Sequence, residues 1–150
     1  MSDQIVYLDS SAIVKRYVSE PGSEYVRNIY RNAYSGELRV SFSLWNVGEV
    51  LGVIDKARTL GRINDEEYLT IRKRFISETL RMHKLNVLVL VHLRVSILKQ
   101  AWKIVERYHV YQADALQIAS AKIVNASTFV VADKKLHEIA LEEGLNSELI

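Results

Sequence analysis

The sequence contains no cysteine and only one proline, Pro21, among its 150 residues. The absence of cysteine excludes disulfides, thiolate nucleophiles and zinc sites with cysteine ligands. No stretch approaches the roughly 18 consecutive apolar residues of a membrane-spanning helix, and the opening residues MSDQ carry no signal-peptide pattern. We therefore expect a cytoplasmic protein with no membrane segment.

The composition is that of an ordinary globular domain, with 49% hydrophobic and 25% charged residues. A chain of 150 residues is long enough to bury a core, and we predict a single domain over residues 1–150. Its 20 basic and 18 acidic residues give a net charge of +2. That total neither indicates nor excludes a nucleic-acid partner, because a local basic surface matters more than the sum.

Short apolar segments alternate with helical patterns along the chain. Segments 5–9, 38–42, 86–91 and 128–133 have the composition of strands, and the last six residues are compatible with a short edge strand. The run NVLVLV at 86–91 is apolar throughout, which predicts an interior strand of a parallel sheet. Strands that alternate with one or two helices predict an α/β domain with a mostly parallel sheet of four to five strands.

Asp114 stands near the start of an alanine-rich helical segment, YQADALQIASA. On a helical wheel it falls between Ile118 and Ala121 rather than on the side of Gln117 and Ser120, which predicts that it points inward. Burying an unpaired carboxylate costs several kcal/mol. Asp114 should therefore have a cation, a set of hydrogen-bond donors or a chemical role.

Three further acids are placed to meet Asp114 at one edge of the predicted sheet. Asp9 and Asp133 end predicted strands, and the carboxyl ends of parallel strands are where ligands bind. Glu49 lies on a predicted helix that follows the second strand. Converging carboxylates repel one another, and Mg²⁺ or Mn²⁺, which prefer oxygen ligands, would relieve that repulsion. Such a site can activate water against a phosphodiester.

Each acid also has a simpler interpretation. Asp9 and Asp133 are both in position to be helix N-caps, and Glu49 taken singly is a typical solvated helix residue. The basic run at 72–74 is more typical of a solvated face than of a phosphate site. The joint pattern of acids, rather than any one of them, supports a metal site.

Other catalytic chemistries find little support. Ser10 and Ser11 lack a G-x-S-x-G elbow, and the histidines have neither H-E-x-x-H nor H-x-H spacing. There is no Walker loop and no G-x-G-x-x-G motif. A phosphotransfer aspartate of the haloacid-dehalogenase type would want a second Asp two positions after Asp9, where Ser11 stands.

The chain resembles PIN-domain ribonucleases, in particular the VapC-type toxins of prokaryotic toxin–antitoxin pairs. Five segments carry the resemblance in the family's order: LDSSAIVK, EPGSEYV, the helix of Glu49, ADALQIASA and VADKKLHEIALEEGL. The first segment and the one around Asp114 are fairly specific together. The resemblance covers essentially the whole chain.

The resemblance implies that Asp9, Glu49, Asp114 and Asp133 form an acidic quartet that binds Mg²⁺ or Mn²⁺ and cleaves single-stranded RNA with an activated water. It implies a three-layer α/β/α fold with strand order 3-2-1-4-5 and frequent dimerisation. It also implies an antitoxin as partner. Ser10 matches a hydroxyl position that supports the metal site.

One departure from the family's pattern concerns the fourth acid. The family commonly has Ser or Thr two residues before it, and here Val131 stands there, so Asp133 is the acid least firmly assigned. A non-catalytic PIN-like module that binds RNA or serves as a scaffold is the alternative function. Whether the substrate is RNA or DNA is left open, since the metal chemistry is the same for both phosphodiesters.

Overall fold

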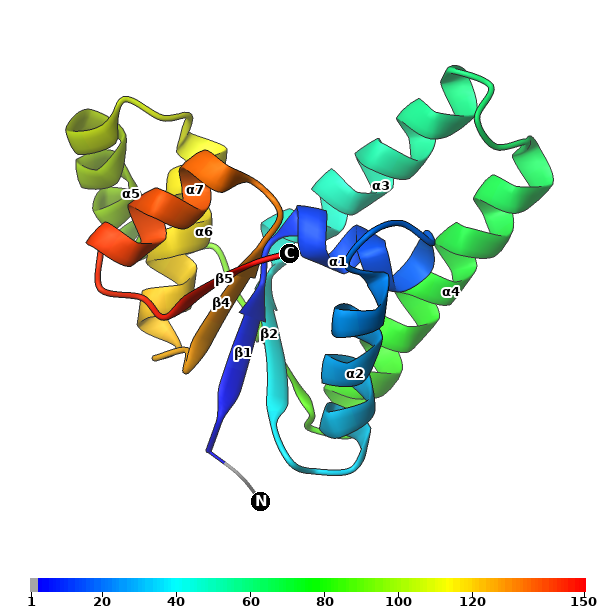
Figure 1. Ribbon diagram of the computed structural model, residues 1–150, viewed down its shortest axis with the longest axis horizontal. Coiled ribbons are helices and arrows are strands. Elements are labelled where there is room, and N and C mark those ends of the chain that lie inside the picture. Colours follow the sequence, from blue (N-terminus) through cyan, green and yellow to red (C-terminus); the bar gives the residue numbers. More distant parts are fainter. Residues whose placement is uncertain (1–2) are drawn as a thin grey trace.

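The computed structural model describes residues 3–150, which form a three-layer α/β/α domain (Figure 1). The five strands are β1 (Ile5–Leu8), β2 (Arg39–Ser43), β3 (Leu88–Val91), β4 (Thr128–Val131) and β5 (Ser147–Leu149). The seven helices are α1 (Ser10–Tyr17), α2 (Ser23–Tyr34), α3 (Leu44–Thr59), α4 (Asp65–Lys84), α5 (Val95–Tyr108), α6 (Gln112–Ile123) and α7 (Lys134–Glu142).

All strand pairs are parallel, and the sheet order is β3-β2-β1-β4-β5. This confirms the predicted fold class and strand order. Pairing of Val6 with Val40 and of Tyr7 with Phe129 fixes the register around the central strand β1. None of the helices within residues 3–150 is both long and apolar enough to cross a membrane.

Alternate side chains along the strands feed two separate cores. Val6 and Leu8 of β1 join a core with α1, α2, α3 and α4, whereas Tyr7 joins a core with α5, α6 and α7. The ring of Tyr7 stacks on that of Phe129 at 5.7 Å between centroids. This two-residue alternation with apolar side chains on both faces is what a sheet covered by helices on both sides requires.

The prediction that segment 86–91 forms an interior strand was wrong, because β3 is at the edge of the sheet. Its apolar run has another cause. Leu88 and Leu90 pack in the core of α1 to α4, while Val91 packs in the core of α5 to α7. Helices therefore cover both faces even at the edge, and an apolar run reports covered faces rather than a central position.

The helix signals at α4 and the turn before it are as predicted. Asn64 and Glu67 form a reciprocal capping box at the start of α4. Gly61, with φ of 73°, follows the end of α3 at Thr59. The far ends of α3 and α4 and their connection project beyond the sheet (Figure 1).

Candidate active site

Four acidic side chains gather where the parallel strands end, and we call this group the acidic edge: Asp9, Glu49, Asp114 and Asp133. Asp9 directly follows β1 and Asp133 follows β4 after one residue. Glu49 lies in the second turn of α3, which starts where β2 ends. Asp114 lies in the first turn of α6. Crossover helices that begin at the same sheet edge thus bring together residues from four parts of the chain.

Asp9 is the most deeply buried member of the acidic edge, with 6% of its surface exposed. Its Oδ1 accepts hydrogen bonds from Ser11 Oγ at 2.6 Å and from the Ala12 amide at 3.0 Å. Burial raises the pKa of Asp9 to about 6, and the negative charges of Glu49 and Asp114 add to the increase. No basic side chain within residues 3–150 forms an ion pair with it.

Glu49 is half-buried and is held by the hydroxyl of Ser10, which donates to Oε1 at 2.7 Å. Burial raises the pKa of Glu49, the Ser10 hydrogen bond opposes that increase, and the charge of Asp114 adds to it. Ser10 in turn accepts a hydrogen bond from Asn46 Nδ2 at 2.8 Å. Ser10 therefore supports Glu49, an acid of the group; its support of a metal site stays a prediction.

Asp114 and Asp133 line a hollow of about 160 Å³ together with His109, Tyr111 and Lys135, among others. Burial raises the pKa of Asp114, the charge of Asp133 raises it further, and Lys135 opposes both. Asp133 itself is exposed. Asp9 is thus coupled electrostatically to Glu49 and Asp114, and Asp114 to Asp133, so the four acids share one edge of the sheet in a chain of neighbouring pairs.

The prediction that Asp114 points inward, away from a solvated side with Gln117 and Ser120, was wrong in part. Asp114 is half-buried, whereas Gln117 and Ser120 have 3% and 1% of their surfaces exposed. All residues from 115 to 121 are buried, because α6 packs against both α5 and the sheet. A helix covered on several sides has no solvated side, and the wheel does not determine the direction of Asp114.

Both aspartates at strand ends are also helix N-caps, as the simpler interpretation predicts. Asp9 caps α1 and Asp133 caps α7, where Asp133 Oδ1 accepts from the Leu136 amide at 2.9 Å. In each case the bonds within residues 3–150 use Oδ1. Capping fixes the carboxylate at the sheet edge and leaves Oδ2 for another ligand, so the two interpretations are compatible.

A buried polar network beneath the acidic edge was missed by sequence reasoning. Gln117 Oε1 accepts from the Tyr7 hydroxyl at 2.9 Å and from Asn46 Nδ2 at 2.8 Å. Asn46 also accepts from the Ser43 amide at 2.7 Å, which completes a capping box at the start of α3. The S-x-x-N spacing of Ser43 and Asn46 was the available signal. Through Ser10, this network fixes Glu49.

Ser11 is a second residue that sequence reasoning did not assign to the site. Its hydroxyl donates to Asp9 and accepts from the Ala132 amide at 3.1 Å. It thereby ties the start of α1 to the segment between β4 and Asp133. Val131 is fully buried in β4, and Ser11 supplies a polar contact between the first acid and the residue that precedes the fourth.

The acidic edge fits a hard divalent cation by donor type and by charge. Its donors are carboxylate oxygens, which Mg²⁺ and Mn²⁺ prefer, and the buried Asp9 carboxylate has no basic partner within residues 3–150. Among the described residues, no three His, Cys, Asp or Glu side chains form a group that could hold one ion. Mg²⁺ is usually held by only one or two carboxylates, with waters and substrate phosphates as other ligands, so a site of this kind does not require three protein ligands.

Comparison with known proteins shows the family. A family profile described as PIN domain matches residues 6–142. The chain belongs to the PIN-domain family. This confirms the resemblance seen in the sequence. A search of curated proteins found no match.

Solved structures with the same fold include a toxin, VapC20, and two further proteins, VapBC2 and FitAcB. Toxin VapC20 of Mycobacterium tuberculosis, described as cleaving the sarcin-ricin loop, is 15% identical and has a TM-score of 0.62, covering 87% of this PIN domain and 92% of its own chain. VapBC2 of Rickettsia felis, bound to a promoter DNA fragment, is 18% identical with a TM-score of 0.67 and coverages of 97% and 98%. FitAcB of Neisseria gonorrhoeae is 16% identical with a TM-score of 0.65 and covers 95% of each chain. At such identities the likeness shows the fold.

Proposed function

We propose that this PIN-domain protein is a metal-dependent endoribonuclease that hydrolyses RNA phosphodiesters and acts as the toxin of a toxin–antitoxin pair. The observation that carries the proposal is the acidic edge, where carboxylates raise one another's pKa and Asp9 is buried with no basic partner within residues 3–150. Membership of the PIN family and a structural neighbour that cleaves the sarcin-ricin loop support RNA as substrate.

The residues of the acidic edge have different roles in this proposal. Asp9 and Asp114 are the main ligands for Mg²⁺ or Mn²⁺, Glu49 is a further ligand or an outer acid, and Asp133 is auxiliary because it is exposed. When bound, the cation would supply an acidified water as nucleophile and offset charge on the phosphodiester oxygens. Ser11 and the Ala12 amide orient Asp9, while Ser10 orients Glu49.

The proposal includes protein partners. The chain resembles the VapC-type toxins of toxin–antitoxin pairs and shares its fold with VapBC2 and FitAcB, and we propose an antitoxin for this chain as well. Homodimerisation and a cytoplasmic location, where RNA substrates are found, complete the proposal. An RNA-binding module without turnover is the outcome if the acidic edge holds no cation.

The test is cleavage of single-stranded RNA with Mn²⁺ by the parent protein and by Asp114→Asn. Asparagine keeps the size of the side chain and removes its charge, so we expect cleavage to fall on the order of 100-fold or more. Glu142→Gln, which removes an exposed acid of α7, is the matched control and should cut like the parent. Cleavage by Asp114→Asn at the parent's rate would show that the site assignment is wrong.

A further inference from the structure

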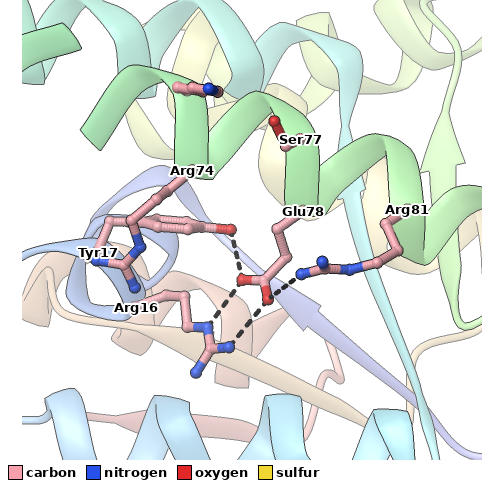
Figure 2. A pocket seen from close by; sticks show the side chains of 7 residues that line it. Arg16, Tyr17, Arg74, Ser77, Glu78 and Arg81 are labelled. Atoms are coloured by element: carbon pink, nitrogen blue, oxygen red, sulfur yellow. Dashed lines mark hydrogen bonds and ion pairs between the residues drawn. The ribbon is translucent and has the colours of Figure 1, made fainter. Parts of the chain in front are cut away.

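A second charged site lies away from the acidic edge, between the end of α1 and the middle of α4 (Figure 2). It is a hollow of about 410 Å³, which we call the cationic hollow. Four of its side chains are cationic and one is acidic. The residues that line it are Arg16, Tyr17, Lys73, Arg74, Ser77, Glu78 and Arg81.

Glu78 organises the base of the cationic hollow. Arg16 donates from Nε to Oε1 at 2.9 Å and from Nη2 to Oε2 at 3.0 Å, and the hydroxyls of Tyr17 and Tyr34 each donate to Glu78 at 2.9 Å. Arg81 approaches the same carboxylate at 3.5 Å (Figure 2). The hydrogen-bonding capacity of Glu78 is therefore used within the protein, and its charge fixes Arg16 in one orientation.

Two cations of the hollow have no such partner. Lys73 and Arg74 are exposed, and within residues 3–150 neither forms an ion pair. The Arg74 guanidinium lies 5.9 Å from the centre of the Tyr17 ring. One carboxylate thus faces four cationic side chains, and the hollow keeps an excess of positive charge.

The shape of this positive charge suits an extended anion. Lys73 and Arg81 are eight residues apart on α4, which separates their backbone positions by about 12 Å along the helix axis. Arg16 adds a further cation from α1. A row of cations of this length matches a chain with repeated charges better than a single small anion.

The position of the hollow relates it to the acidic edge. Asp9 caps the start of α1 and Arg16 stands near its end, about 10 Å along the helix axis. Before a cation binds, the acidic edge repels a polyanion. A nuclease with such a site needs positive charge nearby to hold its substrate.

We infer that the cationic hollow binds backbone phosphates of the RNA strand whose scissile bond lies at the acidic edge. The inference rests on the proposed function for the identity of the strand. Phosphate contacts hold and orient a strand without reading its sequence. Lys73 and Arg74 would contact the phosphates directly when the RNA binds. Arg16 and Arg81, which Glu78 holds in place, would supply fixed positive charge at the bottom of the hollow.

The test compares RNA binding by the parent and by Lys73→Ala/Arg74→Ala, using the fluorescence anisotropy of labelled oligouridylate in EDTA, where no metal-dependent cleavage takes place. We expect weaker binding, and a plot of log affinity against log salt that is flatter by about 0.7 for each phosphate that the variant no longer neutralises. The decrease should be similar for oligoadenylate, because binding to phosphates does not depend on the base. Urea unfolding checks that the double variant keeps the parent's stability.

Lys99→Ala/Lys103→Ala is the matched control, since it removes two exposed lysines from α5. It should bind RNA like the parent. Equal decreases in affinity for the two double variants would overturn the inference in favour of overall charge, and an unchanged affinity in Lys73→Ala/Arg74→Ala would also overturn it. If that variant keeps RNA binding but no longer binds polyglutamate, the hollow is a site for an acidic protein segment instead.

This experiment separates the inference from the proposed function. Asp114→Asn removes cleavage under the proposal but should keep RNA binding that depends on Lys73 and Arg74. A parent protein that never cleaves RNA, yet loses RNA binding in the Lys73→Ala/Arg74→Ala variant, would contradict the nuclease proposal and support the site. A parent that cleaves RNA while this variant binds it normally would contradict only the site.

Discussion

The acidic edge and the Glu78 cluster (Glu78 with Arg16, Tyr17 and Tyr34) both bury a carboxylate, but they surround it with groups of opposite charge or polarity. Glu78 has 8% of its side chain exposed, but Arg16 and two tyrosine hydroxyls bond to it. Although burial opposes it, these partners hold the pKa of Glu78 below its usual value. Asp9 is buried to a similar extent, and burial raises its pKa to about 6; its neighbours Glu49 and Asp114 are acids, which add to the increase instead of opposing it.

The difference teaches that burial alone does not identify a functional acid. Glu78 joins α4 to α1 and α2, and the fold supplies its counter-charge. The acidic edge has no such internal compensation apart from hydrogen bonds and the opposing charge of Lys135 at Asp114. Carboxylates that destabilise one another are what the proposed metal site would explain, beyond the N-caps that Asp9 and Asp133 provide for the fold.

The largest effect on stability should come from Glu78→Gln. The amide leaves Arg16, which has 22% of its side chain exposed, without its charge partner, and cannot accept from both tyrosine hydroxyls and the guanidinium as the carboxylate does. We expect a decrease of about 2–4 kcal/mol in the free energy of unfolding at neutral pH, measured with urea.

Glu143→Gln is the matched comparison for Glu78→Gln. Glu143 also has 8% of its side chain exposed, but its cationic partners Arg107 and Lys122 are 67% and 38% exposed. They can return to water when the charge is removed, so the decrease in stability should be smaller. An equal or greater decrease in stability in Glu143→Gln would contradict the claim that Glu78→Gln is costly because its partners stay buried.

Asp9→Asn should change the free energy of unfolding by a smaller amount, and it should increase it rather than decrease it. Because folding raises the pKa of Asp9 to about 6, the native state binds more protons than the unfolded state between about pH 4 and pH 6. The parent's stability therefore falls as the pH rises through this window. In EDTA the variant should match the parent near pH 4 and exceed it by about 1–3 kcal/mol above pH 6.

Asparagine is as good an N-cap as aspartate, so this comparison isolates the charge. Urea unfolding across the pH range measures it. A difference between Asp9→Asn and the parent that stays constant from pH 4 to pH 7 would show that Asp9 does not have a raised pKa. Glu78→Gln should show the reverse trend, since the contribution of Glu78 is lost as the pH falls through its lowered pKa.

Local patterns were sufficient to predict much of the fold and the positions of the acids. Asp9 and Asp133 follow apolar strands in sequence, and parallel topology then requires them to share an edge. Asn64 and Glu67 form the predicted capping box for similar reasons, because both partners lie within one helical turn. Each of these features depends on short sequence separation or on one rule of topology.

Features that depend on distant partners could not be predicted. Glu78 looks like an ordinary helix residue, and its partners Arg16 and Tyr34 are 62 and 44 positions away. Gln117 looks solvated because a wheel contains no information on α5 or on Tyr7. The edge position of β3 depends on which strands pair, and an apolar run on two covered faces does not reveal this.

We propose that the acidic edge binds a divalent cation, whereas Glu78 is neutralised by side chains of the protein itself. Calorimetric titration of Mn²⁺ at near-neutral pH is the direct test of this difference. The parent should bind Mn²⁺, and Asp114→Asn should bind it much more weakly because it removes one of the two main ligands. Glu142→Gln should bind it like the parent. Absence of binding by the parent, or equal affinity in Asp114→Asn, would contradict the assignment of the acidic edge as a metal-dependent nuclease site.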